Sequence, residues 1–288
     1  MTKLIVLGAT GLLGSTLLKY FSKQSNIKCY GIIRKNSDID KIKNIKNVKL
    51  YKIDYKNQNN IIKVFNKIKP NLIINCIGVV KQLTHKNQLS EIIRINSFLP
   101  HYLTELANVK SKTRFIQFST DCVFSGTKGK YKETDFPGAQ DIYGRSKLLG
   151  ELTYPNTLTL RTSIIGHELQ TKYSLLSWFL DQKKPIKGYK NAIFSGLTAL
   201  EIAKFLDKFI IPNKKLNGMY HLSGNTISKY ELLNLVKSVY KKDIKIIIDK
   251  KVKINRSLNS NLIQKHTGYK PRNWTKLIQE MFEFYMYK

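Results

Sequence analysis

The chain has 288 residues, of which 42% are hydrophobic, enough for one large α/β domain or two coupled ones. With 50 basic and 19 acidic residues its formal net charge is +31, which favours an anionic ligand or a nucleic acid as partner. The lysines are scattered over nearly every segment, and the sequence contains no run of five basic residues and no zinc-finger or RNA-binding signature. We therefore attribute most of the charge to a compositional bias and expect no nucleic-acid partner.

The number and spacing of the cysteines and histidines argue against disulfide bonds and against a metal site. Cys29, Cys76 and Cys122 are odd in number, far apart and without a C-x-x-C spacing, which favours reduced thiols in a cytoplasmic protein. The five histidines form no pair at helical spacing, so we expect no metal site. The apolar run at residues 4–18 is broken by three glycines, and no later run approaches the ~20 apolar residues that a membrane span needs. We expect no membrane association.

The first 22 residues are typical of a strand, a glycine-rich turn and a helix. Residues 3–7 are an apolar run of the buried-strand type, residues 15–22 have helical periodicity, and Gly8-x-x-Gly11-x-x-Gly14 lies between them. This order lays a pyrophosphate on a helix N-terminus. Many glycine-rich turns are purely structural, but the position after the first strand favours a cofactor site. We expect cofactor contacts from Gly8, Thr10, Gly11, Leu12, Leu13 and Gly14.

The second predicted strand, residues 28–33, ends at Arg34-Lys35. An NAD-selective site places an acidic residue here for the ribose 2′-hydroxyl, whereas two cations suit a 2′-phosphate. The alternative is that one of them is an ordinary surface cation of a lysine-rich protein. We expect NADPH to be preferred over NADH.

Further predicted strands and helices alternate along the chain. Strands are expected at residues 48–53, 71–76 and 115–118, and helices at 57–68 and 90–106. The alternation indicates an α/β fold with a parallel, doubly wound sheet of the Rossmann type. Residues at the strand ends and on the second helix are the remaining expected cofactor contacts, with Asp54 as a partner for the adenine amino group: Asp54, Cys76, Ile77, Gly78 and Asn96.

The strand at residues 115–118 stops at Ser119-Thr120, and Tyr143-x-x-x-Lys147 follows on a predicted helix. A separation of four residues places Tyr143 and Lys147 side by side on one helix face. An ammonium beside a phenol lowers the Tyr pKa from its usual ~10, which makes the phenol a usable proton donor. A hydroxyl of Ser119 or Thr120 would hold the substrate oxygen. The alternative for a Y-x-x-x-K spacing alone is a solvated helix face.

After a strand at residues 158–162 the pattern changes. We expect helices at 173–182, 198–211 (capped by Thr198) and 228–240, a loop or hairpin at 187–196, and strands at 219–223 and 244–248. Segments 255–262 and 274–287 close the chain. We expect residues 1–166 to form the dinucleotide-binding domain and 167–288 mainly a smaller α/β substrate lobe, a division that allows the two parts to be interleaved.

The ordered motifs resemble those of the extended short-chain dehydrogenases/reductases over residues 1 to about 166. Within that superfamily, the segments Ser119 to Gly126, Tyr131-Lys-Glu133-Thr-Asp135 and Tyr143 to Glu151 resemble dTDP-4-dehydrorhamnose reductases and related sugar-nucleotide 4-keto reductases. The resemblance implies an NADPH-dependent reduction of a nucleotide-linked 4-keto (deoxy)sugar, in the synthesis of surface polysaccharide precursors.

The resemblance also implies residue roles. Tyr143 protonates the sugar oxygen while the nicotinamide delivers hydride, Lys147 lowers the Tyr pKa and holds the nicotinamide ribose, and Thr120, supported by Ser119, orients the carbonyl. The expected substrate contacts are Val80, Asp121, Cys122, Val123, Phe124, Arg161 and Trp178.

One position departs from the reductase pattern, which has Tyr after Ser-Thr-Asp where this chain has Cys122. The sugar and the nucleotide base therefore stay open. Two alternatives also stay open: an epimerase or dehydratase of the same superfamily, and a regulatory subunit that binds NADP without turnover. A homodimer is compatible with all of these.

Overall fold

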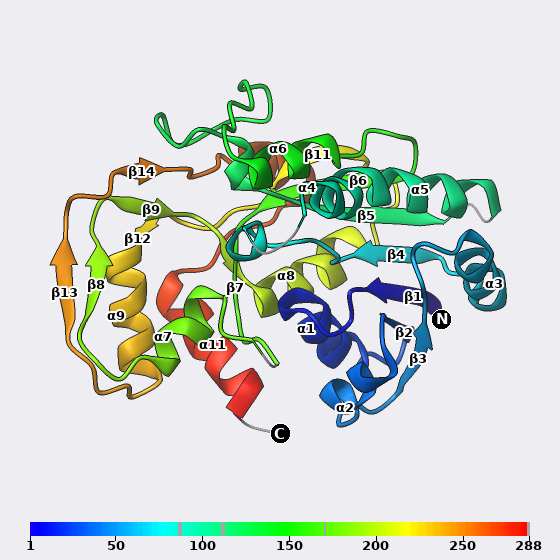
Figure 1. Ribbon diagram of the computed structural model, residues 1–288, viewed down its shortest axis with the longest axis horizontal. Coiled ribbons are helices and arrows are strands. Elements are labelled where there is room, and N and C mark those ends of the chain that lie inside the picture. Colours follow the sequence, from blue (N-terminus) through cyan, green and yellow to red (C-terminus); the bar gives the residue numbers. More distant parts are fainter. Residues whose placement is uncertain (86–87, 111–112, 170, 287–288) are drawn as a thin grey trace. The chain divides into compact units, whose positions relative to one another are not determined.

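The computed structural model describes residues 1–85, 88–110, 113–169 and 171–286 (Figure 1). The chain divides into two compact units. The first comprises residues 1–119, 141–160 and 212–219, and the second comprises 120–140, 161–211 and 220–288. The units differ from a division at residue 166, because 120–140 lies with the second unit and 212–219 with the first.

A seven-stranded sheet organises the first unit. Its strands stand in the order β11-β6-β5-β4-β1-β2-β3, and the register pairs along β5-β4-β1-β2-β3 are parallel. The order reverses at β1, and dinucleotides bind at such a reversal, beyond the carboxyl ends of the strands. The predicted doubly wound parallel sheet is confirmed. The strands are β1 (Thr2–Leu7), β2 (Ile27–Ile33), β3 (Val48–Lys52), β4 (Leu72–Asn75), β5 (Arg114–Thr120), β6 (Thr157–Thr162) and β11 (Gly218–His221).

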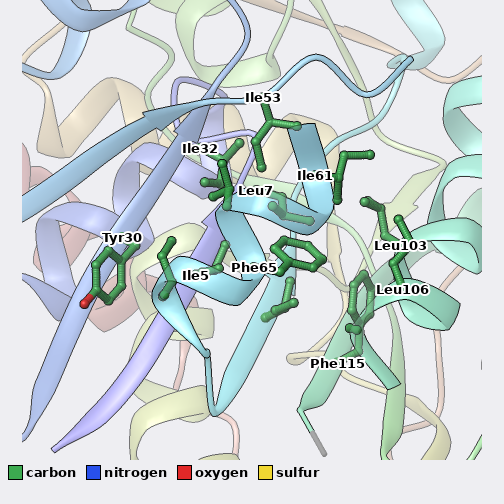
Figure 2. Packing of buried hydrophobic residues seen from close by; sticks show 14 of the residues in the cluster. Ile5, Leu7, Tyr30, Ile32, Ile53, Ile61, Phe65, Leu103, Leu106 and Phe115 are labelled. Atoms are coloured by element: carbon green, nitrogen blue, oxygen red, sulfur yellow. The ribbon is translucent and has the colours of Figure 1, made fainter. Parts of the chain in front are cut away.

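Helices cover the sheet because alternate strand residues point to opposite faces. Ile5 and Leu7 belong to a buried cluster with side chains of α3 and α5 (Figure 2), while Leu18 of α1 approaches the glycine of β2 at Gly31. The helices and turns of this unit are α1 (Leu12–Phe21), η1 (Asn36–Asp38), α2 (Ile39–Ile42), α3 (Gln58–Ile68), η2 (Lys81–Leu83), α4 (Leu89–Ile93), η3 (Arg94–Phe98), α5 (Leu99–Lys110) and α6 (Ile142–Leu149).

The single helix expected over residues 90–106 is interrupted. It consists of α4, the π-helical turn η3 and α5. A π turn inserts an extra residue into an α-helix and is often found at functional sites. Here the turn contains Asn96, one of the expected cofactor contacts.

In the described residues, the second unit contains short strands, α-helices and two helical turns. They are η4 (Asp121–Val123), β7 (Ile164–Ile165), α7 (Leu175–Asp181), β8 (Ile186–Tyr189), β9 (Ala192–Phe194), β10 (Leu197–Thr198), α8 (Ala199–Phe205), η5 (Leu206–Ile210), β12 (Ile227–Ser228), α9 (Lys229–Val239), β13 (Ile246–Asp249), β14 (Ile254–Asn255), α10 (Asn261–Thr267) and α11 (Trp274–Met286). Thr198 caps α8 as expected, accepting a hydrogen bond from the Glu201 amide. The expected closing segment 274–287 ends at Tyr287, which lies outside the described residues.

Of the two forms expected at residues 187–196, a loop or a hairpin, the hairpin is not formed. Its two strands, β8 and β9, belong to different sheets: β8 pairs with β13, and β9 pairs with β12 and β14. Across the part of the chain that the structure describes, no helix has both the length and the apolar composition of a membrane span.

Candidate active site

The glycine turn brings the end of β1 against α1 and the loop after β4. Gly8 has a φ of +73°, and a Cβ there would lie 3.0 Å from the carbonyl carbon and oxygen of Cys76. At Gly14 a Cβ would run into the carbonyl oxygen of Gly8, so only glycine lets α1 pack this closely on β1. The helix begins after Gly11 with no side-chain cap and no acidic residue in its first turn. Its first amides are therefore suited to an anion such as a diphosphate.

We expect Gly14→Ala to lower stability and NADPH affinity together. Alanine gains about 1 kcal/mol of helix propensity over glycine. This gain is outweighed by the collision with the Gly8 carbonyl, since overpacking costs about 1–3 kcal/mol and here shifts backbone. Thermal unfolding and NADPH titration check the result. Gly138→Ala is the control, because its Cβ meets nothing closer than 3.8 Å, and equal behaviour of the two variants would contradict the prediction.

The two cations after β2 are exposed. The backbone amide of Lys35 donates a 3.1 Å hydrogen bond to Asp38, and the Lys41 ammonium pairs with the same carboxylate at 2.6 Å. Burial opposes ionisation of Asp38, but the hydrogen bonds from Lys41 and Lys35 outweigh it and lower its pKa. Asp38 is thus engaged by Lys41, while the side chains of Arg34 and Lys35 remain exposed.

Beyond β3, Asp54 is exposed and its carboxylate accepts a hydrogen bond from the Lys56 amide at 3.0 Å. The next residue, Tyr55, was not singled out from the sequence. Burial raises the pKa of Tyr55, against the nearby charge of Arg34 and a hydrogen bond with the Gly8 backbone. Its phenol therefore supports the turn on which a diphosphate would lie. The available signal was an aromatic residue three positions after the end of β3.

Asn96 organises the loop after β4. Its amide oxygen accepts from the Val79 amide at 2.8 Å, and its nitrogen donates to the Val79 carbonyl and the Ser146 hydroxyl, both at 3.1 Å. The side chain is 1% exposed. Asn96 thus fixes the backbone beside Gly78, in the loop that also contains Cys76, Ile77 and the exposed Val80.

Helix α6 is held at both ends. At its start, Asp141 accepts from the Gly144 amide at 2.8 Å and pairs with Lys81 at 2.7 Å. Further along, the Ser97 hydroxyl donates to the Ser146 carbonyl at 2.9 Å, and Gly150 packs so closely on the Asn96 carbonyl that a Cβ would collide with it. The helix is therefore anchored on the π turn.

This anchored helix carries the expected Tyr–Lys pair. Tyr143 is half-buried, whereas Lys147 is 7% exposed and its Nζ donates to the Phe118 carbonyl at 2.6 Å. Burial lowers the pKa of Lys147 to about 8, and electrostatic interactions with Glu151 and, after it, Cys76 act in the opposite direction. A Cβ on Gly78 would lie 3.9 Å from the same Nζ. The helix thus places a cation at the loop after β4, one turn away from a phenol.

Ser119 is engaged within the protein. Its hydroxyl donates to Oε1 of Glu151 at 2.6 Å, and the residue is 6% exposed. Glu151 ends the motif segment Tyr143 to Glu151, and the sequence alone predicts no role for it. The signal that could have indicated such a role is an acidic residue four positions after Lys147.

Thr120 begins the second unit and caps η4. Its hydroxyl accepts from the Cys122 amide at 3.1 Å and donates to the Asp121 carboxylate at 3.2 Å. Asp121 is 8% exposed; burial raises its pKa, and the positive charge of Arg256 opposes this. The half-buried Cys122 follows it in the same turn.

The other expected substrate contacts of this unit differ in exposure. Val123 and Phe124 are 0% exposed, and the Arg161 guanidinium lies 5.2 Å from the centre of the Phe124 ring. These three side chains form interior packing that supports the η4 turn. Trp178, on α7, is 37% exposed and offers an aromatic surface.

Comparison with known proteins places this site in context. The family model described as RmlD substrate binding domain matches residues 1–286. A dTDP-4-dehydrorhamnose reductase of Aggregatibacter actinomycetemcomitans is 24% identical over 308 residues, covering 98% of both chains. The spore coat polysaccharide biosynthesis protein SpsK of Bacillus subtilis is 24% identical over 298 residues, again covering 98% of both.

Among solved structures, the fold is similar to that of a dTDP-4-dehydrorhamnose reductase from Bacillus anthracis, determined in complex with NADP. The TM-score is 0.78 at 18% identity, with 98% of each chain covered.

Proposed function

Because the chain belongs to the RmlD substrate binding domain family, we propose that it is a nicotinamide-dependent reductase of a nucleotide-linked 4-keto (deoxy)sugar. The observation that carries this proposal is found within the first unit. A glycine turn suited to a diphosphate and an anchored helix bearing Tyr143 and the buried Lys147 meet at the loop after β4. The chain is thus a sugar-nucleotide oxidoreductase of the short-chain dehydrogenase/reductase type, in the synthesis of polysaccharide precursors.

The residues divide the work of a carbonyl reduction. A bound nicotinamide cofactor supplies the hydride. Tyr143 gives a proton to the sugar oxygen as the negative charge develops. The ammonium of Lys147 favours ionisation of the phenol and holds the nicotinamide ribose. Thr120 orients the carbonyl once its hydroxyl turns the proton that it donates to the Asp121 carboxylate toward the sugar oxygen. The exposed Trp178 and the half-buried Cys122 contact the nucleotide sugar in this proposal.

We propose NADPH as the preferred cofactor, held at its 2′-phosphate by Arg34 and Lys35. We expect Arg34→Ala to weaken NADPH binding roughly ten- to a hundredfold and to leave NADH binding unchanged, since a hydrogen bond to a charged group is worth about 1.5–3 kcal/mol. Titration with both cofactors measures this. The exposed Lys63 of α3 provides the control variant Lys63→Ala, and equal affinity of the native protein for the two cofactors would remove the proposal.

The decisive test of function is incubation with NADPH and a panel of dTDP- and UDP-linked 4-keto sugars. A reductase consumes NADPH stoichiometrically with the alcohol formed. An epimerase returns the hydride to its substrate, so conversion without net consumption would overturn the assignment in favour of that class. Tight NADPH binding with no conversion of any sugar would instead favour a regulatory subunit.

A further inference from the structure

Two short hydrogen bonds join the end of β5 to α6 and the residues that follow it. The Lys147 ammonium donates to the Phe118 carbonyl, and the Ser119 hydroxyl donates to the Glu151 carboxylate, each at 2.6 Å. Phe118 and Ser119 are neighbours in β5, and Glu151 follows Lys147 by four residues, just beyond the end of α6 at Leu149. The strand is therefore fixed directly before Thr120.

Glu151 also faces the buried charge. The titratable groups around the Lys147 ammonium are Cys76 after β4, Glu151 after α6, and Tyr143 one turn earlier on the same helix. Burial raises the pKa of the Cys76 thiol, so this group stays neutral near neutral pH. Of these three groups, Glu151 is therefore the one that supplies a negative charge to Lys147.

We propose that Glu151 is a positioning residue of the reductase, whose carboxylate keeps Lys147 charged and holds Ser119 in place one residue before Thr120. The proposal rests on the proposed function for the roles of Tyr143, Lys147 and Thr120, but not on which sugar is reduced. It gives Ser119 a role inside the protein, as the partner of Glu151.

The charge of Glu151 has a measurable consequence. Without it, burial acts on Lys147 with less opposition, and the ammonium loses its proton at lower pH. A close opposite charge favours the ionised form of its neighbour, and its loss shifts the pKa by about 1–3 units. The contribution of Lys147 to NADPH affinity should therefore disappear at least about one pH unit lower in Glu151→Gln, although glutamine keeps the size and a hydrogen-bond acceptor for Ser119.

The experiment is a titration of NADPH affinity between about pH 6 and about pH 10. We expect the midpoint of the affinity loss to move down in Glu151→Gln and to stay in place in Ser119→Ala, which keeps the carboxylate. Lys147→Met should abolish the transition, which assigns it to that residue. Glu105→Gln, at an exposed carboxylate of α5, controls for the change in net charge and should keep the native midpoint.

An unchanged midpoint in Glu151→Gln would overturn the proposal, as would an equal shift in Glu105→Gln. If Glu151→Gln fails to fold, Glu151→Asp replaces it, because aspartate retains the negative charge. A midpoint lowered by a full pH unit in a folded Glu151→Asp variant would contradict the proposal.

This outcome can be separated from the outcome for the proposed function. A native protein that reduces no 4-keto sugar defeats the function, while the binding midpoints still decide whether Glu151 supports Lys147.

Discussion

We expect Tyr143→Phe to lower kcat by roughly 10²–10⁴, the usual contribution of general acid catalysis, while NADPH affinity and melting temperature stay close to the native values. Only a hydroxyl is lost, and α6 keeps its anchors at Asp141 and Ser146. Single-turnover reduction of a 4-keto nucleotide sugar measures the effect on the chemical step.

The matched control is Tyr154→Phe. This surface tyrosine also loses a hydroxyl, one that is hydrogen-bonded to His101 at 2.8 Å, and kcat should stay within about twofold of native because the proton donor is intact. A Tyr143→Phe enzyme that retains at least half of the native kcat would show that another group supplies the proton.

We expect Lys147→Met to lower kcat and also to weaken NADPH binding by roughly ten- to a hundredfold, the value of one hydrogen bond from a charged group. Methionine is of similar length and suits the buried position, which is 7% exposed in the native protein. In the double variant with Tyr143→Phe, the loss in kcat should be less than the sum of the two single losses. The ammonium acts on kcat by lowering the pKa of the phenol, and this effect disappears once the hydroxyl is removed.

Lys204→Met, which removes a partly buried lysine paired with Glu280 in the second unit, should leave kcat and NADPH affinity nearly unchanged. Strict additivity of the Tyr143 and Lys147 losses would mean that the two side chains act independently.

Stability gives an independent readout of the same lysine. Burial lowers the pKa of Lys147 from 10.5 to about 8, so between these values the unfolded chain binds more protons than the native one. Its contribution therefore makes stability rise with pH in this window, and the cost of the buried charge is fully present below about pH 8. Lys147→Met should remove this pH dependence, so between about pH 8 and about pH 10 the melting temperature of the variant should rise less than that of the native protein.

Local patterns were sufficient for the sheet and for the motifs that lie on its strand ends. The apolar runs, the three glycines and the Tyr–Lys spacing each act within a few residues, so their consequences can be derived from the sequence. Helix α1 nevertheless begins at Leu12 rather than Ser15, because Gly11 serves as the N-cap without a side chain to announce it.

Structural features that depend on contacts between residues far apart in the sequence could not be predicted from such local patterns. The π turn at residues 94–98 exists because Asn96 and Ser97 bond to Val79 and Ser146, and nothing local in the sequence marks it. Strands β8 and β9 flank a short turn that is typical of a hairpin, yet each finds its partners more than thirty residues further along the chain. Ser119 was expected to support the substrate carbonyl, but its proton goes to Glu151.

The interleaving of the two units limits how this protein can be divided. The guanidinium of Arg114, in β5, donates to the carbonyl oxygens of Asn213 and Leu216, and these belong to a late return of the chain to the first unit. A protein fragment that ends at residue 166 would lack Asn213 and Leu216. The buried guanidinium of Arg114 would then have lost both carbonyl acceptors. An exchange of either unit between relatives would therefore have to replace three separate segments of the chain rather than one continuous piece.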